Sequence, residues 1–219
     1  MTEGNRLALH VNYYFCLLSP WAYLGTARFG AMAARHGASV LYKPVKVRKV
    51  LDATGGVTLK KRSPQRRAYR MMELKRWRDH LGVPITLEPR YEFPETDFIA
   101  ARTVLAASRE GANAGGLVFG YLRAMWLEER DIADVATIRK IIAESGFDPD
   151  RLLEAAALPE VEETFERYTT EAIAQNVFGV PAWTFDDGEL FWGQDRLEFV
   201  DRAMARRVAA CTSAGRTNP

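Results

Sequence analysis

The most constraining feature of this 219-residue sequence is a strand–helix–strand pattern near its start. The segment LALHVNYYFCL is rich in β-branched and aromatic residues and predicts a strand, and SVLYKPV predicts a second one. Between them, apolar residues recur at helical spacing from Pro20 to about His36, and Gly37 ends the helix. Two strands joined by one helix form a βαβ unit, so we expect the strands to be parallel.

The middle of the chain is predicted to be helical. After a loop marked by Gly55 and Gly56, helical patterns extend from Ser63 to about Val177. Helices are expected over residues 64–81, 96–110, 113–129, 134–145, 149–156 and 160–177. Aspartates stand near several of the expected helix starts and are predicted caps or first-turn acids: Asp97, Asp134 and Asp148.

The C-terminal part returns to strands. PAWTFDDGELFW predicts a hairpin around Asp187-Gly188, and a last helix is expected over about 194–208. The order βαβ, helices, ββα predicts an α/β fold, a thioredoxin-like domain with a large inserted all-α domain. Residues 1–62 and 178–210 would form the thioredoxin-like domain, 63–177 the inserted helical domain, and 211–219 a disordered tail.

Composition and charge exclude several classes of protein. Hydrophobic residues make up 47% and charged residues 26%, as in ordinary soluble globular proteins. The net charge of +2 does not by itself imply a polyanion partner, and no apolar run is long enough to span a bilayer. No signal peptide is recognised, so a cytoplasmic location is expected. The two cysteines, Cys16 and Cys211, form no C-x-x-C motif and the three histidines are scattered, so no metal site is predicted.

Ser19 is the first candidate for chemistry. It precedes Pro20 at the start of the first predicted helix, at the edge of the sheet where open α/β folds bind ligands. A helix N-terminus favours anions, and a serine hydroxyl there could donate a hydrogen bond to a thiolate. Lowering a thiol pKa from about 8.5 to about 6.5 takes about 2.7 kcal/mol, which a charged hydrogen bond of roughly 1.5–3 kcal/mol and the helix terminus together supply. The alternative is that Ser19 is only an N-cap and Pro20 only a favoured first helical residue.

Two later stretches bear on the same helix start. In NVFGVPAWTF, Pro181 stands directly before a predicted strand, so it is a simple strand entry, an edge residue or a cis-proline at a tight turn. In FWGQDRLEFV, Asp195 lies near the start of the last helix and is either a first-turn acid or a partner for a ligand's ammonium group.

Taken in order, YYFCLLSPWAYL, VFGVPAW and FWGQDRL resemble three stretches of the bacterial 2-hydroxychromene-2-carboxylate isomerases and of their relatives, the kappa-class glutathione transferases. The resemblance covers about residues 9–205 and implies a thioredoxin-like fold with an inserted helical domain, glutathione as cofactor and a homodimer. It implies that Ser19 activates glutathione and that the backbone of Val180, before cis-Pro181, pairs with the cysteinyl group of glutathione. It assigns the γ-glutamyl end of glutathione to Trp192, Gly193, Gln194 and Asp195.

The same resemblance implies an activity. The glutathione thiolate would add to a conjugated double bond of an unsaturated aromatic pyruvate or chromene carboxylate, the bond would rotate while single, and the thiolate would leave. The protein would be a glutathione-dependent cis–trans isomerase of aromatic-compound degradation, with a small aromatic carboxylate as substrate and neither nucleic acid nor membrane as partner. Its candidate substrate-binding residues are Trp21, Lys49, Lys60, Lys61 and Tyr91.

The sequence departs from the family pattern at two places. Cys16 stands where many members have aspartate, and it is interpreted as a small buried hydrophobic residue at the strand end. Gly55-Gly56 stands where members often carry an asparagine of the substrate or glutathione site. The identity of the substrate therefore stays open.

Three other functions stay open as well. A kappa-like glutathione transferase would conjugate electrophiles with the same residues. A DsbA-like thiol–disulfide oxidoreductase is disfavoured because the cysteines are not paired. A nucleic-acid-binding module would use residues 60–78, which hold nine Lys or Arg residues and one acid, Glu73. The simpler interpretations of this run are a solvated helix face or charges that attract an anionic substrate.

Overall fold

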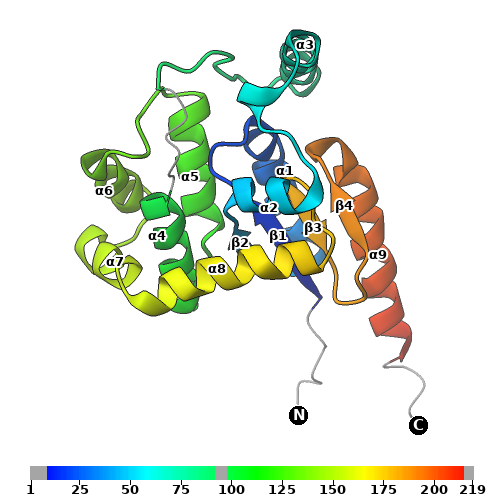
Figure 1. Ribbon diagram of the computed structural model, residues 1–219. Helices are drawn as coiled ribbons and strands as arrows, with labels where there is room; N and C mark the ends of the chain where they lie inside the picture. Colours follow the sequence, from blue (N-terminus) through cyan, green and yellow to red (C-terminus); the bar gives the residue numbers. More distant parts are fainter. Residues whose placement is uncertain (1–8, 92–97, 215–219) are drawn as a thin grey trace.

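The structure is a computed structural model that describes residues 9–91 and 98–214. Figure 1 shows a small sheet surrounded by helices. In chain order the elements are β1 (His10–Phe15), α1 (Pro20–His36), β2 (Ser39–Pro44), α2 (Val47–Thr54), the 3₁₀ turn η1 (Leu59–Lys61), α3 (Pro64–Leu81), α4 (Phe98–Arg109), α5 (Gly115–Trp126), α6 (Val135–Glu144), α7 (Pro149–Ala156), α8 (Pro159–Ala174), β3 (Ala182–Thr184), β4 (Leu190–Trp192), the 3₁₀ turn η2 (Gln194–Arg196) and α9 (Leu197–Ala214).

The sheet has the strand order β2-β1-β3-β4. β1 pairs with β2 in parallel, with Tyr13 opposite Tyr42, which confirms the predicted βαβ unit. β1 pairs with β3 antiparallel, and β3 pairs with β4 antiparallel, with Trp183 opposite Tyr13 on one side and Phe191 on the other. The predicted α/β fold, with a run of helices inserted between the two halves of one sheet, is confirmed.

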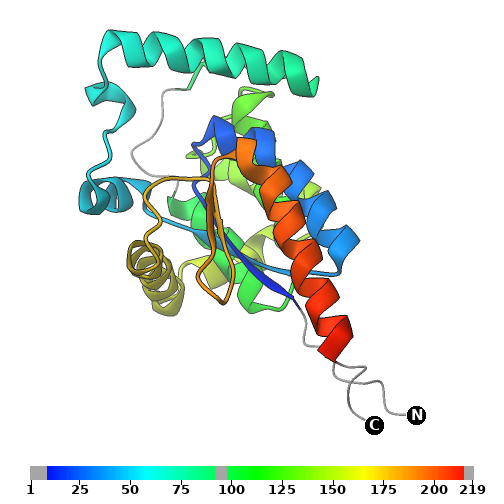
Figure 2. The same ribbon diagram turned by 90° about the vertical axis from the view of Figure 1, so that its right-hand side faces the viewer.

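Helices cover both faces of the sheet because side chains alternate along β1. Tyr13 and Phe15 point to the face covered by α1 and α9, where the Tyr13 ring stacks on Trp183 with centroids 5.3 Å apart. Tyr14 points to the opposite face and packs with Val50 of α2 and Ala172 of α8. Figure 2 shows the sheet between α8 on one side and the α1–α9 pair on the other.

The inserted helices share the core of the sheet. Val104 of α4, Leu117 of α5 and Ile138 of α6 belong to the same buried cluster as Tyr13. The predicted boundaries after residues 62 and 177 therefore separate segments of the chain that share one continuous hydrophobic core. Helix α3 differs, because Leu74 is its one buried residue. Figures 1 and 2 show α3 at the end of the molecule where β1 ends and α1 begins.

Two expectations need correction. The stretch before Gly55 forms α2, where only a strand end and a loop were expected, and Gly55 ends this helix in the left-handed conformation with φ 76°. The last helix begins as a 3₁₀ turn and continues to Ala214, so residues 211–214 are helical and were wrongly placed in the disordered tail.

Asp134 and Asp148 are confirmed as N-caps, whereas Asp97 lies outside the described residues. In the described residues, none of the helices is long and apolar enough to cross a membrane.

Candidate functional site

Ser19 caps α1 through its side-chain hydroxyl. Its backbone is extended (φ −93°, ψ 116°), its Oγ accepts the N–H of Ala22 at 3.2 Å, and Pro20 takes the first helical position. The side chain is buried, at 7% exposure, and its own O–H has no acceptor among the described residues. A hydroxyl can accept and donate at once, so Ser19 can cap the helix while donating to a ligand.

The N-terminal end of α1 favours a negative charge. Its first turn contains no acidic side chain, and the basic residues Arg35 and His36 lie in its last turn. The partial positive charge of the helix N-terminus is therefore not neutralised by a neighbour in its own first turn. An anion that accepts a hydrogen bond from Ser19 would be stabilised there.

Val180 and Pro181 lie beside the end of β1. Their peptide bond is cis, which confirms one of the three interpretations of Pro181. Tyr14 pairs with Ala182, so continuing this antiparallel register sets Phe15 opposite Pro181 and Cys16 opposite Val180. Within the described residues, the backbone N–H and C=O of Val180 form no hydrogen bond. Such groups are available to an extended peptide ligand.

The turn after β4, residues 193–196, is hydrogen-bonded to Pro181 and so lies at the same corner of the molecule, where β1 ends and α1 begins. The Gly193 N–H donates to the Pro181 carbonyl at 2.9 Å, and the Arg196 N–H donates to the Gly193 carbonyl at 3.0 Å. Gly193 has φ 97°, a conformation that favours glycine. Trp192 is 51% exposed and lies over Gly179, where an added Cβ would stand 2.6 Å from its indole nitrogen.

Gln194 and Asp195 complete this corner. Gln194 is buried against α1, where its Cβ would stand 3.0 Å from a Cβ added at Gly25. Asp195 is exposed, and its carboxylate faces the α-carbon of Gly193 and lies 3.3 Å from Arg196. The structure thus brings together the residues predicted for glutathione: Ser19, Val180, Pro181, Trp192, Gly193, Gln194 and Asp195.

The predicted substrate-binding residues are more scattered. Lys49 donates to both carboxylate oxygens of Glu166 on α8, at 2.9 and 2.8 Å. Hydrogen bonds lower the pKa of the Glu166 carboxylate, the one from Lys46 most and the one from Lys49 next. The ammonium group of Lys49 is therefore already paired with a carboxylate. Trp21 is half-buried in the first turn of α1, and Tyr91, 37% exposed, adjoins the segment 92–97 that lies outside the described residues.

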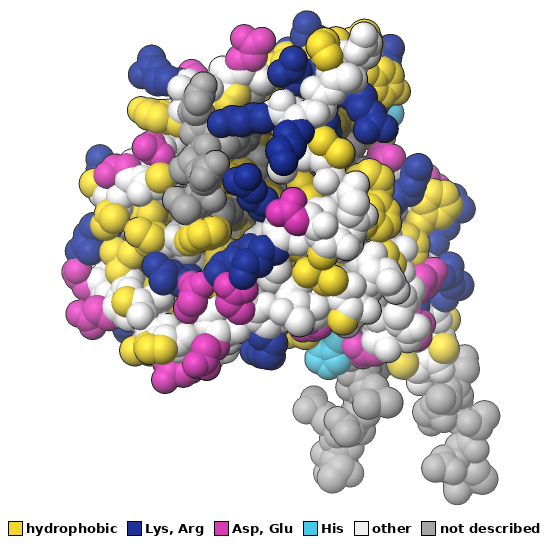
Figure 3. All heavy atoms as spheres, in the orientation of Figure 1, with side chains coloured by type: hydrophobic (Ala, Val, Ile, Leu, Met, Phe, Trp, Pro, Cys, Tyr) yellow, Lys and Arg dark blue, Asp and Glu magenta, His cyan; other side chains and the backbone are white. Residues whose placement is uncertain are grey.

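Lys60 and Lys61 lie in η1 and are exposed, and no ion pair involves them in the described part of the chain. Figure 3 shows Lys and Arg side chains concentrated toward the α3 end of one face, while Asp and Glu lie mostly toward α7 and α8. The basic run is thus largely a solvent-exposed surface near the edge of the sheet that carries Ser19.

Cys16 is buried at 6% exposure, as expected for a small hydrophobic residue, and its carbonyl accepts the Ser19 N–H at 3.2 Å. Cys211 is exposed and lies far along the chain, in α9. A redox pair with Cys16 in a C-x-x-C arrangement is therefore not available.

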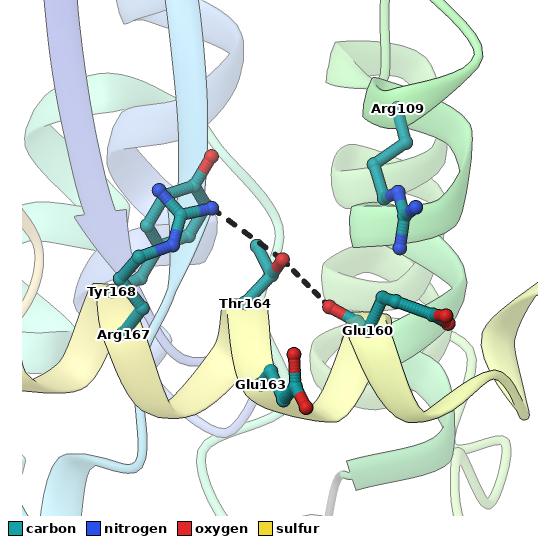
Figure 4. A pocket seen from close by; sticks show the side chains of 6 residues that line it. All are labelled: Arg109, Glu160, Glu163, Thr164, Arg167 and Tyr168. Carbon is teal, nitrogen blue, oxygen red and sulfur yellow. Dashed lines mark hydrogen bonds between the residues drawn. The ribbon is translucent and has the colours of Figure 1, made fainter.

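Two hollows that the sequence did not indicate lie away from Ser19. One of about 460 Å³ lies between α8 and the end of α4, and Figure 4 shows its exposed charged lining of Arg109, Glu160, Glu163 and Arg167 with Thr164 and Tyr168. The other, of about 670 Å³, lies between the C-terminal half of α1, β2 and the α4–α5 connection. Neither hollow is lined by a predicted site residue. Their linings consist largely of solvated charges and small residues, which do not mark a binding site in a sequence.

Comparison with known proteins gives a consistent result. Residues 10–205 match the family model of the DSBA-like thioredoxin domain. The chain is 27% identical over 192 residues to a 2-hydroxychromene-2-carboxylate isomerase of Sphingobium xenophagum, covering 87% of this chain and 95% of that protein. A solved 2-hydroxychromene-2-carboxylate isomerase superposes with a TM-score of 0.78 at 25% identity, covering 96% and 100% of the two chains. The cytosolic disulfide reductase DsbM of Pseudomonas aeruginosa, solved with GSH, shares the fold, with a TM-score of 0.63, 17% identity and coverage of 95% and 100%.

Proposed function

The chain belongs to the family of DSBA-like thioredoxin domains, and we propose that it is a glutathione-dependent cis–trans isomerase of 2-hydroxychromene-2-carboxylate-type intermediates in aromatic-compound degradation. Its similarity over nearly full length to isomerases of that name supports the isomerase role. Glutathione dependence and the substrate are the finer parts of the proposal, and they rest on the chemistry of the corner around Ser19.

The observation that carries the proposal is the buried hydroxyl of Ser19. It caps α1 by accepting the N–H of Ala22, and its own proton has no acceptor among the described residues, at a helix end that favours anions. A hydrogen bond to a charged acceptor stabilises it by roughly 1.5–3 kcal/mol. Ser19 would therefore hold a bound thiol in its ionised form near neutral pH.

The surrounding residues fit glutathione at two further points. The backbone of Val180, unpaired within the described residues, offers one N–H and one C=O to the cysteinyl unit. The exposed carboxylate of Asp195 offers an acceptor for the ammonium group of the γ-glutamyl unit. When bound, glutathione would supply a thiolate that adds reversibly to the conjugated double bond of the substrate, which allows that bond to rotate.

The substrate is proposed to be anionic, and Lys60 and Lys61 are the better candidates to bind its carboxylate. Both are exposed and without an ion pair in the described residues, and η1 lies at the end of the molecule where α1 begins (Figures 1 and 2). Lys49 is the weaker candidate because Glu166 already binds its ammonium group. Roles for Trp21 and Tyr91, a homodimer and a cytoplasmic location stay predictions.

The proposal is tested by turnover of 2-hydroxychromene-2-carboxylate, followed by absorbance, with and without glutathione. The expected result is isomerisation that requires glutathione and leaves its thiol concentration unchanged at the end. Stoichiometric loss of thiol with a halogenated electrophile, without isomerisation, would instead identify a kappa-like transferase.

The remaining alternatives have their own assays. Reduction of insulin disulfides that disappears in Cys16→Ala would identify an oxidoreductase. Salt-sensitive binding of duplex DNA that disappears when Arg66, Arg67 and Arg70 are changed to Gln would identify a nucleic-acid-binding protein. Either result without glutathione-dependent isomerisation would overturn the proposal.

A further inference from the structure

Arg28 of α1 is hydrogen-bonded to the turn after β4. Its Nη1 donates to Gln194 Oε1 at 2.8 Å. Arginine carries only donors, so the oxygen of the amide must face it, and the orientation of the Gln194 side chain follows from chemistry. Among the described residues, this is the hydrogen bond that joins η2 to α1.

Gln194 fits into a space left by Gly25. It is 1% exposed, and a side chain at Gly25, one turn before Arg28, would press on its Cβ at 3.0 Å. Its Nε2 is buried and has no partner among the described residues. An unsatisfied buried amide group costs free energy that an apolar side chain of similar size avoids. Stability alone therefore does not account for glutamine at this position.

Arg28 is likewise not explained by an ion pair. It is half-buried, burial lowers its pKa, and no carboxylate binds it within the described residues. Arg35 on the same helix shows the ordinary alternative, because it is exposed and pairs with Asp201 of α9 at 2.9 Å. The bond to Gln194 is thus the specific interaction of the Arg28 guanidinium group.

The turn that Gln194 anchors is also attached to β3. Gly193 donates to the carbonyl of Pro181, next to Val180, and Asp195 follows Gln194 directly. The Arg28–Gln194 bond therefore connects the helix that begins at Ser19 with the two other points at which glutathione is proposed to bind.

We propose that Arg28 is a positioning residue, which holds the turn 193–196 through Gln194 at a fixed place relative to the N-terminal end of α1. This inference rests on the proposed function. The thiol end of glutathione would be held at Ser19 and its γ-glutamyl end at Asp195, so both contacts form together only if helix and turn keep one geometry. Loss of the bond should weaken glutathione binding and leave the ionisation of the bound thiol unchanged, because Ser19 is unaffected.

The test compares Arg28→Met with Arg35→Met as a control on the same helix. Isothermal titration with reduced glutathione should show about tenfold weaker binding for Arg28→Met, which corresponds to about 1.4 kcal/mol, and wild-type binding for Arg35→Met. The thiol pKa of the saturated complex should equal that of the wild type. Arg28→Lys, which keeps a donor, should restore part of the affinity.

A second measurement does not need glutathione. Hydrogen exchange of the ligand-free protein, read by mass spectrometry, should show faster exchange for residues 193–197 in Arg28→Met and unchanged exchange in Arg35→Met. Wild-type affinity together with wild-type exchange in Arg28→Met would overturn the inference. If the wild type itself binds no glutathione, the proposed function fails, and the exchange measurement still decides whether Arg28 positions the turn.

Gln194→Met serves if Arg28→Met does not fold. It removes the unpaired amide, so its unfolding midpoint should equal or exceed that of the wild type. We expect its glutathione affinity to fall all the same. A Gln194→Met protein that binds glutathione as tightly as the wild type would contradict the positioning role.

Discussion

Helices α1 and α3 begin and end with the same local devices. Each begins with Ser-Pro, with the N–H of Ala22 bonded to Ser19 Oγ at 3.2 Å and that of Arg66 bonded to Ser63 Oγ at 3.4 Å. Each ends at a glycine with φ 62°, Gly37 in α1 and Gly82 in α3. By these local criteria the two helices are equivalent.

Their surroundings are not equivalent. Ser19 is buried beside the end of β1, whereas Ser63 is exposed. α1 buries eight residues, including Leu24 and Phe29, while α3 buries Leu74. A Ser-Pro pair therefore indicates where a helix begins, and its tertiary environment decides whether the serine can also bind a ligand.

The largest expected effect separates the two helices by stability. Leu24→Ala should lower the free energy of unfolding of the whole protein by about 2–5 kcal/mol, because it leaves a cavity in the main core. Leu74→Ala should instead release α3, with a smaller change in urea midpoint and with faster hydrogen exchange confined to residues 64–81. Met72→Ala, at an exposed position of α3, is the control. Equal urea midpoints and uniformly faster hydrogen exchange in both leucine variants would show that α3 unfolds together with the rest of the protein.

The next effect separates the two serines by activity. Ser19→Ala should reduce the isomerisation rate by roughly 10- to 150-fold, because the thiolate loses a hydrogen bond of about 1.5–3 kcal/mol. The pKa of bound glutathione should rise, so its thiolate absorbance at neutral pH should fall. Ser63→Ala removes a cap of similar local geometry, which costs about 1 kcal/mol of stability, and should leave rate and absorbance unchanged. An unchanged absorbance in Ser19→Ala would remove the chemical basis of the proposed function.

The smallest effect concerns a third cap, Asp134 of α6. Hydrogen bonds from the side chain and backbone of Thr137 lower the pKa of its carboxylate. A carboxylate whose pKa is lower in the folded state stabilises the protein at pH values above its unfolded-state pKa of about 3.9. This contribution is lost as the pH falls through the folded-state pKa. Asp134→Ser keeps a cap that does not titrate, so its urea midpoint should fall less between pH 5 and pH 2. Identical pH profiles for variant and wild type would contradict this account.

Most helix boundaries could be predicted because their signals are local. The predicted ranges of α1, α3 and α7 agree with the structure, and each begins at a capping residue followed by proline. Helix α2 was missed because it is short and its N-cap, Lys46, forms no side-chain capping bond. Its position depends instead on Val50 in the core and on the bonds of Lys46 and Lys49 to Glu166.

The candidate site divides along the same line. The three motifs predicted which residues would surround Ser19, and strand pairing brings Val180 and Gly193 to that corner. Lys49 was predicted for the substrate, and nothing near it in the sequence indicates that Glu166, 117 residues away, binds its ammonium group. Arg28 carried no signal at all, because its partner lies 166 residues further along the chain.

The sequence by itself determined where α1 begins, that Ser19 caps it and that strands enclose a helical insertion. These features follow from hydrogen bonds and side-chain periodicity within a few residues. Only the tertiary structure decided that Ser19 is buried beside Val180, that α3 buries a single residue and that Arg28 connects α1 to the turn after β4. Those contacts depend on how segments far apart in the sequence pack against one another, and local propensities carry no information about such packing.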